Sequence, residues 1–435
     1  KEDWEAYGGE YCEFTMCKEN RDTMNAVHSL ARILRVKPKD FTYAGTKDKR
    51  GMTTQRVSAH RITADKISGA NMMLRGVVCG DFSYSWERLM LGDLTGNHFI
   101  LTLRDAKFDS PADVEIAMES LRDHGFINYF GLQRFGTRVA GTHQIGLAML
   151  KGEWEKAVDL IMAPDALDRQ DIGDARRHFM QNQDAEKALR LFPKSACGER
   201  ALLEHFRRKK TVGNFQQALD AIPRTLRTMY VHAYQSYVWN AMATERIREY
   251  GRTPVVGDLD DDAKGVDKPS NGSRHSKRPK KNVQVVAIQN EEELRKYSIE
   301  DVLLPMPGRS VLYPANKIGA KYVEFMAKHG MDPHKMQREN EIVNLHGGYR
   351  KLISRPANVK WYVFRLICRY NDPNIPLTPS APQLALGAQP PASIPAGVYH
   401  AVIVEFTLSS SQYATMALRE ITRSGTSASR HRKLA

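Results

Sequence analysis

Residues 41–62 read FTYAGTKDKRGMTTQRVSAHRI, and this stretch shows how the chain begins to fold. The segments 41–46 (FTYAGT) and 52–62 (MTTQRVSAHRI) are rich in aromatic and β-branched residues, a composition typical of strands. Between them, 47–51 (KDKRG) is a charged run that ends in glycine, which indicates a turn. The stretch therefore predicts two strands joined by a charged loop that contains Asp48.

The segments on either side add a helix and further strands. Residues 10–17 (EYCEFTMC) alternate as a strand does, and Asp22 or Thr23 can cap a helix that follows. Strands are also indicated at 82–89 (FSYSWERL) and 97–104 (NHFILTLR). This order predicts an α+β fold built on a mixed, mainly antiparallel sheet flanked by helices.

The middle of the chain, residues 127–249, has a mainly helical pattern, and its clearest helix is expected at 224–250. Apolar residues recur there at steps of three and four and form one face: Leu226, Met229, Tyr230, Ala233, Tyr234, Tyr237 and Ala241. Such a face usually packs in a core, and stacking of its rings on RNA is the alternative. Another helix is expected from Pro111 through Leu121, with Gly125 as its stop.

Two segments interrupt this pattern of helices and strands. Residues 258–282 are polar, and we expect a disordered loop whose acidic beginning, DLDDD, is a solvated stretch. Its KRPKK run at 277–281 is typical of a nuclear localisation patch or a loose RNA contact. Residues 371–395 are rich in proline, which predicts a second long loop.

The charge of the chain points to polyanions as partners. Lys and Arg number 64 against 50 Asp and Glu, a net charge of +14. Nucleic acid is the commonest partner of such a field, and a charge that serves only solubility is the alternative. No apolar run approaches the roughly 20 residues of a membrane-spanning helix, so we expect no membrane partner.

Sequence motifs for metals and nucleotides are missing. The five cysteines are scattered without a CxxC pair, and the histidines form no HExxH pattern. The chain also contains no GxxxxGK[ST] phosphate loop and no GxSxG serine motif. We therefore expect neither a metal site nor a cofactor.

Asp48 is the residue that carries chemistry in the opening stretch. It lies between Lys47 and Lys49 and is followed by Arg50, so three cations favour its ionised form. An ionised carboxylate can act as a nucleophile, and the same cations would collect phosphates around it. On local features alone, an ordinary charged surface turn is the better interpretation.

Seven strings in order along the chain change that interpretation: YCEFTMCKENRDT (11–23), AGTKDKRGMTTQ (44–55), LGDLTGNHFILTLR (91–104), INYFGLQRFGT (127–137), AYQSYVWN (233–240), LPMPG (304–308) and QYATMALRE (412–420). Together they resemble the TruD family of RNA pseudouridine synthases over nearly the whole chain. The polar insertion at 258–282, which contains KRPKK, makes the chain similar to eukaryotic members of that family. The resemblance implies that Asp48 is the catalytic nucleophile.

The string INYFGLQRFGT supplies the other implied site residues. By the resemblance, Asn128 and Phe130 lie at the active site. An asparagine can hydrogen-bond a carboxylate and hold its rotamer, and a phenylalanine ring can stack on a uracil that is turned out of RNA. Two further residues either order this loop or contact the RNA backbone: Gln133 and Arg134.

The resemblance implies isomerisation of uridine to pseudouridine in tRNA, at position 13, and also in mRNA and other small RNAs. No cofactor is needed because the product is an isomer of the substrate. We expect a monomer in the nucleus, with the cytoplasm as a second compartment. A basic RNA-binding scaffold without catalysis is the alternative from another class, and a metal-dependent nuclease is a second rival.

The resemblance also implies the domain organisation. A catalytic domain is expected from residues 1–122 and 341–435, and a mostly helical domain, residues 123–340, is inserted as the second wall of an RNA-binding cleft. Family members normally carry a further N-terminal segment with a basic residue that reaches the site. We therefore expect residues upstream of Lys1 to complete it.

Overall fold

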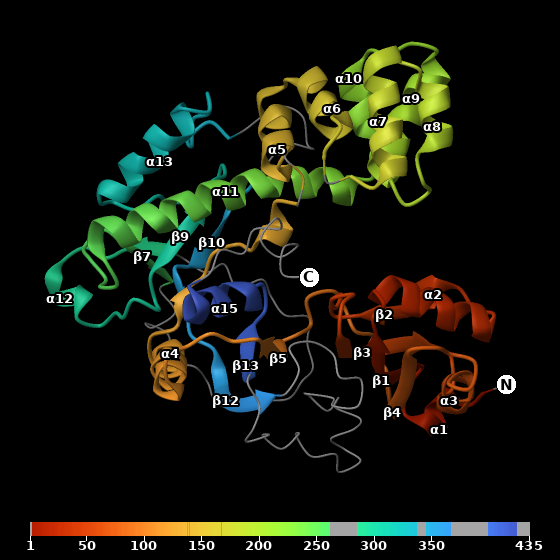
Figure 1. Ribbon diagram of the computed structural model, residues 1–435, viewed down its shortest axis with the longest axis horizontal. Helices are drawn as coiled ribbons and strands as arrows, with labels where there is room; N and C mark the ends of the chain where they lie inside the picture. The colour runs from red at the N-terminus through yellow and green to blue at the C-terminus, as the bar shows by residue number, and fades with distance from the viewer. Residues whose placement is uncertain are drawn as a thin grey trace. The chain divides into compact units, whose positions relative to one another are not determined.

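The computed structural model describes residues 2–136, 138, 140–166, 168–261, 285–336, 345–366 and 399–423. The chain forms two compact units, each made from two pieces of sequence (Figure 1). Unit 1 comprises Lys1–Asp109 and Ala357–Ser411, and unit 2 comprises Ser110–Pro356 and Gln412–Ala435. The units are defined by packing alone, so the predicted catalytic and inserted domains stay a prediction.

The first sheet of unit 1 has the strand order β2-β3-β1-β4, and all its neighbouring strands are antiparallel. Its strands are β1 (Tyr11–Glu19), β2 (Phe41–Tyr43), β3 (Met52–His60) and β4 (Val77–Ser85). Alternation along β1 buries Cys12, Phe14 and Met16 in one cluster with residues of α2 (Thr23–Leu34) and α3 (Ala64–Ala70). Helix α1 (Trp4–Tyr7) is a single turn that precedes β1.

The second sheet of unit 1 joins distant parts of the sequence. Its order is β12-β13-β5, with β5 (Gly96–Arg104), β12 (Ala357–Leu366) and β13 (Tyr399–Ser409). Both pairs are antiparallel, and Val404 of β13 lies opposite both Leu101 and Trp361. The apolar run of β13 therefore forms the middle of this sheet.

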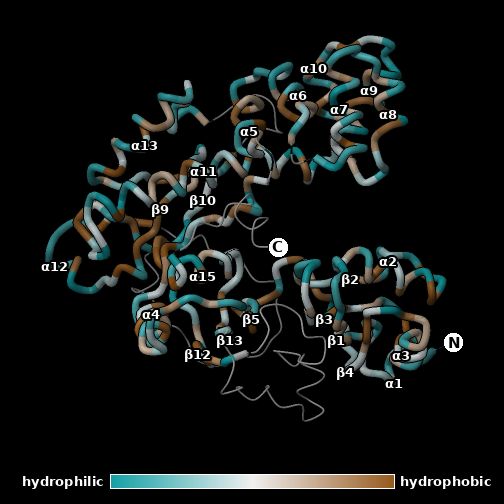
Figure 2. Tube along the Cα trace, in the orientation of Figure 1, coloured by the Kyte–Doolittle hydropathy of each residue, from teal (hydrophilic) through white to brown (hydrophobic). Residues whose placement is uncertain are grey.

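Unit 2 is mainly helical. Its helices are α4 (Pro111–His124), α5 (Thr142–Lys151), α6 (Trp154–Met162), α7 (Gln170–Asn182), α8 (Ala185–Leu191), α9 (Cys197–Lys209), α10 (Phe215–Ala221), α11 (Arg224–Tyr250), α12 (Glu291–Leu294), α13 (Lys317–Ala327) and α15 (Ala414–Thr422). Figure 2 shows polar and apolar residues alternating along α7–α10, as amphipathic helices require.

Unit 2 also contains short strands. A sheet of order β10-β9-β7-β8 consists of β7 (Leu259–Asp261), β8 (Val285–Ala287), β9 (Leu303–Met306) and β10 (Gly348–Lys351). A separate pair joins β6 (Phe126–Ile127) to β11 (Ile353–Ser354). The strand pairs of both units described here are antiparallel, and with the helices they confirm the predicted α+β class.

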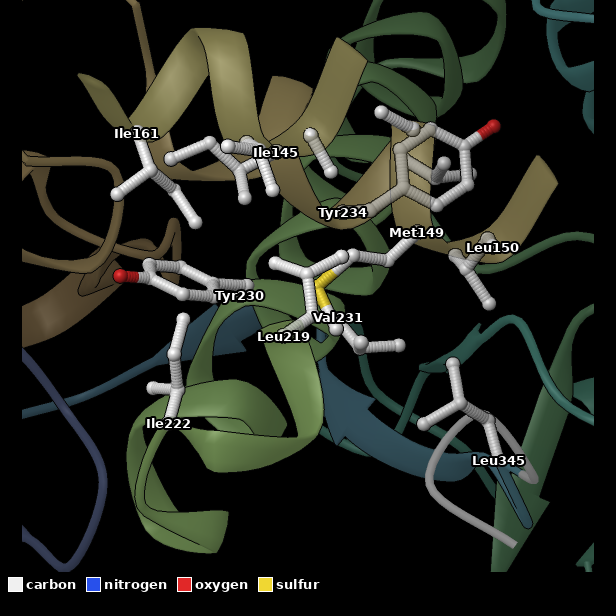
Figure 3. Packing of buried hydrophobic residues seen from close by; sticks show 14 of the residues in the cluster. Ile145, Met149, Leu150, Ile161, Leu219, Ile222, Tyr230, Val231, Tyr234 and Leu345 are labelled. Carbon is white, nitrogen blue, oxygen red and sulfur yellow. The ribbon is translucent and has the colours of Figure 1, made fainter. Parts of the chain in front are cut away.

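Helix α11 has the predicted bounds and is the core of unit 2. Its Tyr230, Val231 and Tyr234 are buried and face α5, which contributes Ile145 and Met149 (Figure 3). A Cβ atom at Gly146 of α5 would lie 2.0 Å from the Tyr230 carbonyl oxygen, so only glycine permits this approach. The aromatic face of α11 thus packs mainly in the core, as expected.

The prediction of a solvated acidic stretch is wrong at its beginning. Asp258 is 1% exposed and Asp260 is also buried, and β7 begins at Leu259. Arg246 of α11 neutralises Asp258 through hydrogen bonds of 2.9 Å from Nε and 2.6 Å from a terminal nitrogen. The remainder of the predicted loop, residues 262–282, lies outside the described residues.

Other predicted bounds need smaller corrections. β2 ends at Tyr43 rather than residue 46, and β4 ends at Ser85 rather than residue 89. α4 continues to His124, where Gly125 follows with a φ of +63°. The proline-rich segment 371–395 and the KRPKK run lie outside the described residues.

Candidate active site

The Asp48 loop, residues 44–51, connects β2 to β3 in unit 1. Asp48, Lys49 and Arg50 are exposed, whereas Lys47 is half-buried. Within the described residues, the Asp48 carboxylate accepts no hydrogen bond and forms no ion pair. The loop thus presents a carboxylate that no described residue binds.

Lys18 binds the backbone of this loop through its buried side chain. It lies on β1 with a side chain that is 1% exposed. Its ammonium donates to the carbonyl oxygens of Asp48 at 2.7 Å, Arg21 at 2.6 Å and Lys47 at 3.3 Å. Burial lowers the pKa of Lys18, and the carboxylates of Asp22 and Asp48 partly oppose this.

Three polar side chains complete the attachment of the loop. Thr23 accepts from the Lys47 backbone N–H at 3.0 Å and donates to Gln55 Oε1 at 2.8 Å. Gln55 in turn donates to the Gly45 carbonyl oxygen at 3.0 Å. Lys47 Nζ reaches Asn97 Oδ1 of β5 at 2.8 Å, and burial lowers the Lys47 pKa. The loop backbone is therefore held at several points while Asp48 stays exposed.

Asn128 lies in unit 2 and is engaged on both sides of its amide. It is buried, its Nδ2 donates to the Lys351 carbonyl oxygen at 3.1 Å, and its Oδ1 accepts from an Arg350 terminal nitrogen at 2.6 Å. The Arg350 Nε also donates to the Asn128 carbonyl oxygen at 2.8 Å. In unit 2 by itself, Asn128 therefore positions Arg350.

Phe130 is at the centre of an aromatic cluster with Trp239 and Tyr413. Its side chain is 9% exposed, and the Arg350 guanidinium carbon lies 4.2 Å from its ring centroid. Trp239 meets the ring edge-on at 5.7 Å, and Tyr413 lies at 6.3 Å. One face of the ring is thus occupied by a cation, and base stacking on Phe130 stays a prediction.

Arg350 was not predicted as a site residue. It is 9% exposed, and burial lowers its pKa to about 10, with Tyr413 raising it and Arg134 lowering it further. Its sequence context is GYRK in a short strand, and a cation at a strand position is only a weak indication of a functional residue. Lys18 gives a clearer signal because it falls on the inward face of an alternating strand.

Four of the family-like strings meet around Phe130. Asn240 accepts from the Phe130 N–H at 2.8 Å and donates to its carbonyl oxygen at 3.0 Å. Trp239 donates to the Leu304 carbonyl oxygen at 3.1 Å, and Gln235 donates to that of Pro307 at 2.7 Å. The strings at 127–137, 233–240, 304–308 and 412–420 therefore build one cluster.

The remaining predicted residues have different surroundings. Arg134 donates to Ser236 Oγ at 3.2 Å, and its guanidinium carbon lies 5.9 Å from the Phe130 ring. Gln133 is exposed on the same 3₁₀ turn, Leu132–Arg134. The structure thus groups four predicted residues in each unit, and the pairing of Asn128 with Asp48 stays a prediction because it joins the two.

The described residues contain no group of three or more His, Cys, Asp or Glu side chains that could hold a metal ion. Among the helices in the described part of the chain, none is both long and apolar enough to cross a membrane.

Comparison with known proteins places this arrangement in a family. A family model described as tRNA pseudouridine synthase D (TruD) matches residues 1–421. The pseudouridylate synthase 7 homolog of Bos taurus is 40% identical over 428 residues, which cover 98% of this chain and 61% of that protein. The multisubstrate pseudouridine synthase 7 of Schizosaccharomyces pombe is 38% identical over 453 residues, 99% of this chain and 65% of that protein.

This chain thus spans about three fifths of the length of such relatives. The crystal structure of the TruD protein of Methanosarcina mazei has the same fold, with a TM-score of 0.68 at 24% identity over 96% of this chain and 89% of that one. The predicted resemblance to the TruD family is confirmed. Because the family model covers residues 1–421 of 435, the chain belongs to the tRNA pseudouridine synthase D (TruD) family.

Proposed function

We propose that this protein isomerises uridine to pseudouridine in RNA, with Asp48 as the nucleophile. The observation that carries the proposal is the Asp48 carboxylate, which has no protein partner in the described residues, on a backbone held by Lys18. A nucleophile needs both properties, since a carboxylate already bound by the protein is a poor attacking group and a mobile one is rarely aligned.

The reaction requires no external reagent. The C1′–N1 bond breaks, the uracil rotates, and a new bond forms between C5 and C1′. The proton lost from C5 is balanced by the proton gained at N1, so the product is an isomer. Asp48 either attacks C1′ or abstracts a proton first, and the proposal accepts both orders.

The two cations that follow Asp48 support RNA as the substrate. Lys49 and Arg50 are exposed and form no ion pair within the described residues, so they are available to phosphates. In unit 2, we propose that Phe130 stacks on the rotating base and that Asn128 orients Asp48. Gln133 and Arg134 would order the 127–137 loop or contact the RNA backbone.

The substrates proposed are tRNA, at position 13, together with mRNA and other small RNAs. The family description refers to tRNA, and the S. pombe relative is described as multisubstrate. We propose further that the protein is a monomer and acts in the nucleus and the cytoplasm. Sedimentation of the purified protein and imaging of a tagged copy test these two proposals.

The test of the reaction is tritium release from RNA labelled at C5 of uridine, with wild type, Asp48→Asn and a control, Asp65→Asn. Asp65 is an exposed aspartate in the first turn of α3. We expect Asp48→Asn to lower turnover by roughly 10³-fold or more while RNA binding is retained, and Asp65→Asn to match wild type.

Turnover that survives Asp48→Asn would overturn the assignment of the nucleophile. Wild-type protein that binds RNA but forms no pseudouridine would favour the alternative of a basic RNA-binding scaffold. RNA cleavage that EDTA abolishes would favour the metal-dependent nuclease. Carbodiimide labelling of the product RNA identifies pseudouridine directly and separates these outcomes.

A further inference from the structure

The connection between β4 and β5, residues 86–95, exposes three large apolar side chains next to the candidate site. Leu91 is 80% exposed, and Trp86 and Met90 are also exposed. A single exposed leucine is unremarkable on any protein surface. Leu91, however, lies on a hydrogen-bonded turn that is itself bound to the Asp48 loop. Its exposure at this position therefore needs a physical explanation.

The turn is held internally. The Asp93 N–H donates to the Met90 carbonyl oxygen at 3.0 Å, which closes a four-residue turn. The Asp93 carboxylate accepts from the Met90 N–H at 2.7 Å. Gly92 has a φ of +101°, as the third position of a type II turn requires. Leu91 therefore occupies the corner of a turn with little freedom to fold back.

The turn is also attached to the loop that carries Asp48. The Gly92 N–H donates to the Ala44 carbonyl oxygen at 2.7 Å. Leu94 packs beside Gly45, with its Cδ2 atom 3.7 Å from the position that a Cβ would take there. Leu91 is thus presented at a constant position relative to the backbone that leads to Asp48.

RNA chemistry supplies a role for such a side chain. A base that is acted on must leave its stack, and its departure leaves an apolar gap between its neighbours. Proteins fill comparable gaps with apolar wedges such as leucine or methionine. Arg88 in the same connection is exposed, as are Lys49 and Arg50, so phosphates can be bound nearby.

We propose that Leu91 inserts into the RNA stack at the place vacated by the target uridine. The inference rests on the proposed function, because it assumes an RNA base that turns out toward Asp48. It adds a residue that contacts substrate outside the reacting base. Leu91 acts on the flipping equilibrium, so its loss slows turnover more than it weakens RNA binding.

Fluorescence of 2-aminopurine next to the target uridine measures the insertion separately from the chemistry. The measurement uses the Asp48→Asn background, in which the base turns out but is not converted. Leu91→Ala is compared with Met72→Ala, an apolar side chain of unit 1 that is 92% exposed and, among the residues that the structure describes, shares no hydrogen bond with the Asp48 loop. Leu91→Met serves as the conservative variant because methionine can also act as a wedge.

We expect Leu91→Ala to lose more than half of the fluorescence rise and, in otherwise wild-type protein, to lower kcat by about tenfold or more with KM nearly unchanged. Leu91→Met should restore most of both signals, and Met72→Ala should match its parent. Equal behaviour of Leu91→Ala and Met72→Ala would overturn the proposal. If the wild-type protein forms no pseudouridine but the fluorescence rise still depends on Leu91, the wedge is supported and the proposed reaction fails.

Discussion

The Asp48 loop of unit 1 and the Phe130 cluster of unit 2 place their charges in opposite ways. The loop exposes a carboxylate with two cations, and the buried Lys18 of β1 donates to main-chain carbonyl oxygens of the loop and of Arg21. In the cluster the cation itself, Arg350, is enclosed by aromatic rings and bound to Asn128. Within the described residues, the loop leaves its carboxylate without a hydrogen-bond or ion-pair partner, whereas the cluster binds its polar groups.

This difference fits the roles that we propose for the two regions. A carboxylate with the role proposed for Asp48 must stay unbound, so its position has to be fixed through the backbone. Lys18 fixes that backbone by donating to its carbonyl oxygens. In the aromatic cluster every buried polar group needs a hydrogen-bond partner, because a buried polar group without one costs free energy. The contrast predicts that substitutions in the cluster mainly change stability, whereas those in the loop mainly change turnover or RNA binding.

The largest effect is expected for Arg350→Met in the Phe130 cluster. Methionine fills part of the volume but removes the donors to Asn128 Oδ1 and to its carbonyl oxygen, which leaves both acceptors buried. We expect a loss of about 2–4 kcal/mol in the free energy of unfolding. Urea denaturation followed by tryptophan fluorescence measures it, because Trp239 lies 5.5 Å from the guanidinium carbon.

Arg134→Met is the matched control for this substitution. Arg134 also lies near the Phe130 ring, but it is only half-buried, and within the described residues its side chain donates only to Ser236 Oγ. Its loss should therefore cost less than about 1 kcal/mol. Equal losses for the two variants would show that burial of the Asn128 acceptors does not distinguish the arginines.

A smaller effect on stability is expected for Lys18→Met. The three carbonyl oxygens lose their donor, but the loop is near solvent and water can replace part of the interaction. We expect a loss of about 1–2 kcal/mol in stability, faster hydrogen exchange at residues 47–51, and turnover reduced by roughly tenfold or more. Exchange measured by mass spectrometry and tritium release test the two parts separately.

Lys66→Met provides the comparison for Lys18→Met. Lys66 is an exposed lysine of the same unit, and its ammonium forms an ion pair with the Glu2 carboxylate at 3.0 Å. Its removal should leave hydrogen exchange in the Asp48 loop unchanged. If exchange at residues 47–51 is also unchanged in Lys18→Met, Lys18 does not hold the loop.

Much of the fold was predictable because it depends on local periodicity. The bounds of α11 followed from its apolar spacing, and the strands of unit 1 from alternation. The acidic run at 258–261 was mispredicted because its environment depends on Arg246, which lies on another element. A local pattern cannot show that a distant guanidinium will neutralise a carboxylate.

The candidate site was predictable only in part. The resemblance implied that Asp48, Asn128 and Phe130 are site residues, whereas local features favoured an ordinary surface turn around Asp48. Lys18 and Arg350 were missed because their roles depend on three-dimensional contacts with main-chain oxygens and aromatic rings. Strand alternation shows that a side chain points inward, but it does not show what that side chain will meet.

The smallest effect on stability, and the sharpest contrast with Arg350, is expected for the double substitution Lys49→Ala and Arg50→Ala. Both side chains are exposed, so the free energy of unfolding should hardly change. If each binds one phosphate, the slope of the logarithm of RNA affinity against the logarithm of salt concentration becomes shallower by about 1.5. Filter binding at several salt concentrations measures that slope.

Arg350→Met should leave the same slope unchanged, because a guanidinium that is 9% exposed and bound to Asn128 cannot replace counterions on a phosphate. A slope that changes equally in both proteins would mean that Arg350 is reached by RNA, and the distinction between an open loop and a closed cluster would then be wrong. A slope that changes only in the double variant assigns phosphate binding to the loop. In that case part of the +14 charge acts on RNA through the exposed Lys49 and Arg50, and Arg350 serves to hold structure.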